Sequence, residues 1–201
     1  MLTTAAASHP GGSGRLLYAL PEKNVRVWLL KRHNDTPPSG QLLQRWLNEL
    51  LGDEALIERT DAGKPFVTNS SLQFNFSHSP HWFALSWRIG HEPIGVDIED
   101  LGRRPSFAAL ADRYFHPAEK AAWQAADAPE SAATWLRIWT RKEAVLKAHG
   151  LGLRLQLNTL DTCHDAVQHP VIGRWQLHSF RLPDAVVSVS WPITSALRDI
   201  P

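Results

Sequence analysis

The chain has little of what extracellular and membrane proteins rely on. Cys163 is the one cysteine among 201 residues, so no internal disulfide can form, which favours a reducing, cytoplasmic setting. No run of about 18 apolar residues occurs, so neither a membrane-spanning segment nor a membrane partner is expected. Residues 1–14 lack the basic start and the apolar run of a signal peptide, and we expect a flexible tail there.

A one-sided charge is missing as well. The 21 lysine and arginine residues nearly balance the 20 acidic residues, and this net charge of +1 gives no reason to expect a nucleic-acid partner. Hydrophobic residues, at 43%, suffice for a core, and a charged fraction of 20% argues against disorder. The length fits one domain or two small halves that share a core.

The sequence does contain a change of periodicity along the chain. Turns are expected at 63–65 and 77–80. Strands followed by helices and then by strands predict the α+β class. The expected strands are 25–31, 72–76, 82–88, 93–101, 173–182 and 185–191, and the expected helices are 41–51, 107–114, one starting at 116–117, and 131–149.

The stretch 93–101, PIGVDIEDL, has the apolar residues of a buried strand but contains two acidic residues. Alternation puts Asp97 and Glu99 on one face, about 7 Å apart, where they repel each other unless a positive group lies between them. Gly95 shares this face, which suits close approach by a ligand. The plain alternative is a solvated face at the end of a strand.

A third carboxylate lies in the expected helix 131–149. In its segment WTRKEAVLK, residues four apart share a face, so Trp139, Glu143 and Lys147 form a row at the border of the apolar face. A surface Glu–Lys pair is the plain alternative. Combined with the two strand acids, Glu143 would complete an all-oxygen site suited to Mg²⁺, which tends to bridge to phosphates.

Two further segments could hold an anion. Lys64 lies in the tight turn GKP, and Ser77 and His78 lie in NFSHS at the end of a strand, where hydroxyls, backbone N–H groups and an imidazole could meet a phosphate. Each of these has a plain alternative, because a lysine on a turn is usually solvated and a lone histidine is often structural.

The order GKP, NFSHS, PIGVDIE and WTRKEAVLK, within about 63–152, resembles the 4'-phosphopantetheinyl transferases, in particular their monomeric, two-halved branch. The resemblance implies transfer of the phosphopantetheine arm of coenzyme A to a serine of an acyl or peptidyl carrier protein, with Mg²⁺. Such carriers serve fatty-acid, polyketide and non-ribosomal peptide synthesis, and adenosine 3',5'-bisphosphate is released. It also implies two similar α+β halves related by a pseudo-twofold, here 15–92 and 93–201, with coenzyme A between them.

The resemblance also implies roles for individual residues. Mg²⁺ would be held by Asp97, Glu99 and Glu143. Glu143, or a water that it orients, would be the general base, and Lys147 would stabilise or protonate the leaving phosphate. Lys142 would be a second phosphate contact. The nucleotide end of coenzyme A would be held by Lys64, Ser77, His78 and Arg45.

Some positions stay open on the sequence alone. Glu119 matches an acidic position near the metal in relatives, but it also stands where a glutamate caps a helix. Pro80 replaces a usual glycine and removes a backbone donor. A basic surface that steers an acidic carrier could include Arg103, Arg104, Arg137 and Arg141. Two other functions fit less well: a binding module for coenzyme A or carrier without catalysis, and a Mg²⁺-dependent phosphodiesterase.

Overall fold

Two antiparallel sheets form the centre of the protein in a computed structural model that describes residues 3–5, 15–20, 23–103, 106–150 and 155–194. The first sheet has the order β1 (Thr3–Ala5), β2 (Leu16–Leu20), β3 (Val25–Lys31), β7 (Trp82–Ile89), β6 (Leu72–His78). The second has the order β8 (Gly95–Asp100), β11 (Ala185–Pro192), β10 (Gly173–Arg181), β9 (Ala166–His169). A separate hairpin pairs β4 (Ile57–Arg59) with β5 (Pro65–Val67).

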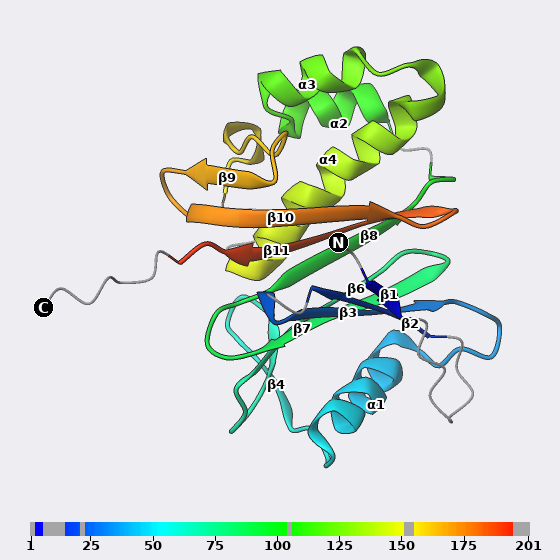
Figure 1. Ribbon diagram of the computed structural model, residues 1–201, viewed down its shortest axis with the longest axis vertical. Helices are drawn as coiled ribbons and strands as arrows, with labels where there is room; N and C mark the ends of the chain where they lie inside the picture. Colours follow the sequence, from blue (N-terminus) through cyan, green and yellow to red (C-terminus); the bar gives the residue numbers. More distant parts are fainter. Residues whose placement is uncertain (1–2, 6–14, 21–22, 104–105, 151–154, 195–201) are drawn as a thin grey trace, which may run out of the picture.

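The two sheets pack against each other, and helices cover their outer faces (Figure 1). Apolar residues of β3 and β7 meet those of β8 and β11 in one buried cluster between the sheets. Helix α1 (Ser39–Leu51) packs on the outer face of the first sheet. Helix α4 (Ala128–His149) covers the second, with α2 (Phe107–Tyr114) and α3 (Pro117–Gln124) beside it. This arrangement confirms the α+β class. The pseudo-twofold and the boundaries between tail and halves stay predictions.

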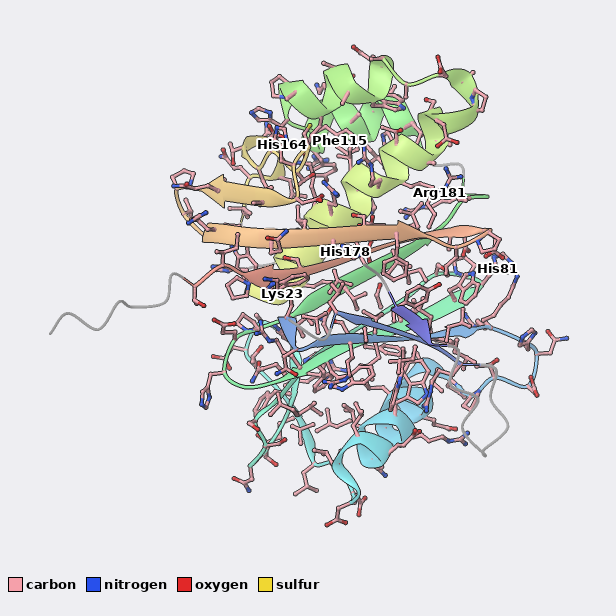
Figure 2. The ribbon with its side chains drawn as sticks, viewed as in Figure 1. Lys23, His81, Phe115, His164, His178 and Arg181 are labelled. Atoms are coloured by element: carbon pink, nitrogen blue, oxygen red, sulfur yellow. The ribbon has the colours of Figure 1, made fainter. Side chains whose placement is uncertain are left out.

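Helix α4 is the element that carries the WTRKEAVLK segment across the second sheet (Figure 1). It ends at Gly150, whose left-handed backbone has φ 86°. Near its N-terminal half, Phe115 packs against Trp135 with ring centroids 5.1 Å apart (Figure 2). No helix of the described ranges combines the length and the apolar character that crossing a membrane requires.

Most expected elements are confirmed, with differences at their ends. Strand β6 continues through His78, where a turn was expected, because Ser77 and His78 stay paired with Ala84 and Phe83 of β7. Helix α4 starts at Ala128, three residues before the expected 131, with a proline in its first turn. Alternation in short strands is a weak signal, and the sequence analysis missed β1, β2, β4, β5 and β9.

Gly95 lies where the backbones of β8 and α4 touch. A Cβ built on it would come within 2.0 Å of the Ala144 carbonyl oxygen and 2.6 Å of the Ala148 amide nitrogen. The expected close approach at Gly95 is therefore real, but the group that approaches is helix α4 and not a ligand. This contact fixes the helix on the strand that carries Asp97.

Substitution Gly95→Ala is expected to destabilise the fold, because backbone atoms cannot move aside as a side chain can. Overpacking of this kind costs about 1–3 kcal/mol, and occasionally more. Urea unfolding would measure the loss. Gly102→Ala is the matched control, since nothing lies within 4 Å of the Cβ position there. Equal unfolding free energies for the two variants would contradict the tight contact.

Candidate active site

A cleft of about 280 Å³ lies between the β5–β6 region and the C-terminal part of α4. It brings together three segments that the sequence analysis singled out, the turn 63–65, strand β6 and the helix segment 139–147. Its lining consists of Ala62, Gly63, Lys64, Pro65, Asn75, Phe76, Glu143, Leu146, Lys147 and Gly150.

Next to this cleft, Asp97 is held by one residue from each neighbouring element. Its Oδ1 accepts hydrogen bonds from the Oγ of Ser77 on β6, at 2.9 Å, and from the Nζ of Lys147 on α4, at 2.6 Å. Lys147 also donates to the Oγ of Ser77, at 2.8 Å. Asp97 is only 5% exposed, and its Oδ2 is buried without a hydrogen-bond partner among the described residues. Each strand acid thus has its own cation from the chain, Lys147 on Asp97 and Arg103 on Glu99.

The three predicted carboxylates lie close enough to repel one another. Burial raises the pKa of Glu99 to about 7, and the charge of Asp97 adds to the rise. Burial also raises the pKa of Glu143, again with help from Asp97. Lys147 and Arg103 act in the opposite direction on both glutamates, and Arg103 forms an ion pair with Glu99. Both glutamates therefore lose part of their tendency to ionise, first because they are buried and second because they lie near Asp97.

The chemistry of these donors fits Mg²⁺, which binds carboxylate oxygens and would meet the unpartnered Oδ2 of Asp97. Their arrangement does not yet form such a site. No three or more histidine, cysteine, aspartate or glutamate side chains in the described parts of the chain are gathered so that they could hold a metal ion. Asp97, Glu99 and Glu143 share one region, with the cationic groups of Lys147 and Arg103 on two of them.

Lys64 lies across the cleft from these acids. Its Nζ donates to the carbonyl oxygen of Ala148, at 2.8 Å, near the end of α4. Burial lowers the pKa of Lys64 to about 8. The turn that presents it contains Gly63 with φ 82°, a backbone conformation that favours glycine. Lys64 therefore lines the cleft with an amine that is bound to the end of α4, and its contact with phosphate stays a prediction.

Two other predicted coenzyme contacts lie outside the cleft lining. His78 is exposed at the end of β6, and its ring packs near those of Phe76 and Phe83, with centroids 6.5 and 5.9 Å away. Arg45 lines a separate hollow along α1. Ser77, predicted to hold the nucleotide, instead hydrogen-bonds to Asp97.

Lys142 is a correction. Its side chain has an exposed fraction of 0%, and its Nζ lies 2.8 Å from Oε2 of Glu119. It also donates to the carbonyl oxygens of Leu157, at 2.7 Å, and Leu160, at 2.5 Å. An ammonium has three N–H donors, and all three are used here. The predicted contact between Lys142 and phosphate is therefore wrong.

Glu119, which the sequence left open, has a structural role in this arrangement. It completes a capping box by accepting from the backbone of His116, at 2.7 Å. Its other oxygen accepts from the amide and the hydroxyl of Thr162, at 2.8 and 2.6 Å. With Lys142, it joins α3, α4 and the segment around Thr162 through one buried ion pair.

The four arginines considered for carrier steering differ in their surroundings. Arg137 is exposed on α4, Arg103 pairs with Glu99, and Arg104 lies outside the described residues. Arg141 is only 4% exposed, and its guanidinium donates to Asp165 and to the Oγ of Ser179. A buried guanidinium cannot steer a partner, so this expectation for Arg141 is wrong.

Asn75 is a residue of the site that the sequence analysis missed. Its Oδ1 accepts from the amide of Val96, at 3.0 Å, and so joins β6 to β8 beside the cleft. The signal was available, because strand alternation puts Asn75 and Ser77 on the same face. Both side chains reach β8, and they hold the strand that carries Asp97.

A family model of the 4'-phosphopantetheinyl transferase superfamily matches residues 93–193. The 4'-phosphopantetheinyl transferase gsp of Aneurinibacillus migulanus is 29% identical over 121 residues, 59% of this chain and 49% of that protein. The 4'-phosphopantetheinyl transferase of Bacillus subtilis is 31% identical over 114 residues, 54% and 49% of the two chains. The 4'-phosphopantetheinyl transferase AcpT of Escherichia coli is 33% identical over 138 residues, 63% and 68%.

The chain therefore belongs to the 4'-phosphopantetheinyl transferase superfamily, whose named relatives here are enzymes. The matched segment contains Asp97, Glu99, Glu143 and Lys147. The chain spans about half the length of the Aneurinibacillus and Bacillus relatives, so their activity does not pass to it by similarity alone.

Proposed function

We propose that this chain transfers the 4'-phosphopantetheine arm of coenzyme A to a serine of an apo acyl or peptidyl carrier protein and releases adenosine 3',5'-bisphosphate. The observation that carries the proposal is the contact of Asp97 with Lys147, at 2.6 Å, beside a cleft that Glu143 and Lys64 also line. These are the acidic and basic groups that phosphoryl transfer needs. The single cysteine supports a reducing, cytoplasmic setting, and the balanced charge gives no reason to expect nucleic acid as a partner. The resemblance to the monomeric branch favours a monomer, and the lack of a long apolar run argues against a membrane partner.

In this proposal the pyrophosphate of coenzyme A lies in the cleft between Lys64 and Lys147. Mg²⁺, held by Asp97, Glu99 and Glu143, would neutralise the phosphate charge. Glu143 takes the proton of the carrier serine, directly or through a water. The burial that raises its pKa makes it a stronger base than a solvated glutamate. Lys147 stabilises the charge that develops on the leaving phosphate.

The nucleotide end of coenzyme A, with its 3'-phosphate, would extend from the cleft over the first sheet. His78 and Arg45 are exposed and stay candidates for the nucleotide and its 3'-phosphate. A carrier protein, acidic around its serine, would approach a surface that includes Arg137 and Arg103.

Mass spectrometry of a carrier protein tests the proposal. The protein is incubated with coenzyme A, Mg²⁺ and an apo acyl carrier protein, and a peptidyl carrier is tested in parallel. A gain of about 340 Da, the mass of one phosphopantetheine arm, establishes the transferase. Coenzyme A binding without a gain on any carrier favours a binding module. Cleavage of coenzyme A in the absence of a carrier favours the phosphodiesterase.

The KM for coenzyme A is expected to rise as the pH increases through about 8. Burial lowers the pKa of Lys64 to about 8, so its positive charge is present below this pH and lost above it. The charge attracts phosphate, and affinity falls when it disappears. Steady-state kinetics across this range would show the rise. Lys64→Arg stays charged, and a profile just as steep in this variant would contradict the assignment.

A further inference from the structure

The Nζ of Lys147 lies against the carboxylate that a cation at Asp97 would use, on Oδ1, whereas Oδ2 has no hydrogen-bond partner among the described residues. The Nζ is 2.6 Å from Oδ1 of Asp97, closer than most ion pairs of the described residues, and also donates to Ser77. The pair is asymmetric, because the Asp97 side chain is 7% exposed and that of Lys147 is 29% exposed. The carboxylate is thus fixed in the interior, and the lysine reaches it from the cleft.

The carboxylate cluster carries counter-ions supplied by the chain itself. Arg103 pairs with Glu99 and Lys147 pairs with Asp97. Within the described ranges these acids are not gathered around one point as metal ligands would be. A cation on Oδ2 of Asp97 and the ammonium of Lys147 on Oδ1 would lie on the two oxygens of one buried carboxylate and would repel each other.

We propose that Lys147 is a built-in competitor for the divalent cation at Asp97. In the metal-free protein its ammonium occupies Oδ1 of Asp97, and metal binding moves it into the cleft, where it meets the phosphate of coenzyme A. This inference rests on the proposed function. A lysine suits the task because its four-carbon stem is flexible and its charge is compact.

The competition works in both directions. When one ligand changes the affinity for a second, the second changes the affinity for the first by the same factor. Phosphate that draws Lys147 into the cleft therefore raises the affinity of Asp97 for the metal, and the metal raises the affinity of the cleft for phosphate by the same factor. In the metal-free protein, Lys147 lowers the cost of the buried Asp97 charge, while Oδ2 has no partner among the described residues. Lys147 thereby couples the binding of the metal to the binding of the phosphate.

Direct binding of Mn²⁺ tests the proposal without any measurement of transfer. Free Mn²⁺ is followed by its electron paramagnetic resonance signal during titration of the protein without coenzyme A. Lys147→Met is expected to bind Mn²⁺ about tenfold more tightly than the unchanged chain, within the range typical of coupling between ligands. Lys147→Arg keeps a cation near Asp97 and is expected to stay close to the unchanged chain.

Lys64→Met is the matched control, because it removes one positive charge from the same cleft without touching a carboxylate. Its Mn²⁺ affinity is expected to change by less than about twofold, since long-range charge effects are screened. If Lys64→Met raised the Mn²⁺ affinity as much as Lys147→Met, the proposal would be overturned, because the loss of one positive charge anywhere in the cleft would then explain both increases. Unchanged or weaker binding in Lys147→Met would overturn it as well.

A second measurement uses the unchanged chain and covers the case in which the variant does not fold. Reductive methylation of Lys147, read by peptide mass spectrometry, is expected to become faster on addition of Mg²⁺, with Lys120 on α3 as the remote reference. No acceleration would overturn the proposal. Because neither measurement includes a carrier protein, a missing mass gain in the transfer assay would refute the proposed function separately.

Discussion

Asp97→Asn is expected to lower the rate of phosphopantetheinyl transfer at least about a hundredfold, with little change in shape. Asparagine keeps the volume and one oxygen but loses the charge. The amide has no charge to neutralise Lys147 in the metal-free protein, and its NH2 group replaces one of the two carboxylate oxygens that could bind a cation. Removal of one preorganised electrostatic group at a reacting charge typically costs about 10²–10³ in turnover. Mass spectrometry of the carrier over time would measure the rate.

Asp100→Asn is the matched control on the same strand. Asp100 is similarly buried, at 6% exposure, but its carboxylate accepts from Ser79, at 2.7 Å, and contacts His81, at 2.9 Å. His81 lies at the far end of the first sheet (Figure 2). Asp100→Asn is therefore expected to keep near-normal turnover. If both variants lost activity equally, the loss would come from damage to β8 and not from the role of Asp97.

The sequence predicted those parts of the site that depend on local periodicity. The row of Glu143 and Lys147 follows from helical spacing, and the shared face of Asp97 and Glu99 follows from strand alternation. Each pattern places a residue relative to its own element only. The contact between Lys147 and Asp97 joins elements far apart in the chain, and neither the spacing nor the family resemblance predicted it.

The expectations for Lys142 and Gly95 were wrong because the sequence does not show which group each residue contacts. Lys142 and Lys147 are both lysines of α4, yet the first is enclosed by the segment around Leu157 and the second faces the cleft. The helix sequence does not show that Lys142 is enclosed, because the segment that encloses it, around Leu157 and Leu160, comes later in the sequence. Gly95 is a similar case, since a glycine indicates close approach but not what approaches.

The corrected roles also divide the segment WTRKEAVLK by function. Arg141 and Lys142 hold the helix to the segment 160–162 through buried hydrogen bonds. Glu143 and Lys147 line the cleft instead. Two successive turns of α4 therefore carry both the anchor and the proposed catalytic groups, and damage to the anchor is expected to displace the groups beside it.

Lys142→Met is expected to destabilise the protein by about 3–5 kcal/mol, the usual cost of removing one partner of a buried ion pair. Glu119 would keep its charge at 0% exposure with only the donors of His116 and Thr162. The carbonyls of Leu157 and Leu160 would lose their shared donor. Because whole domains are stable by only about 5–15 kcal/mol, urea unfolding would show a large shift of the midpoint.

A double variant separates the ion pair from its neighbours. Glu119→Gln with Lys142→Met removes both charges, so the double variant is expected to lose less stability than the sum of the two single changes. Strict additivity of the two unfolding free-energy changes would contradict the coupling.

Lys120→Met is the control at an ion pair that is not buried. It breaks the pair of Lys120 on α3 with Asp112 on α2 and is expected to lower the free energy of unfolding by less than about 1 kcal/mol. Transfer by Lys142→Met should fall even where the protein is still folded, since the anchor next to Glu143 is lost.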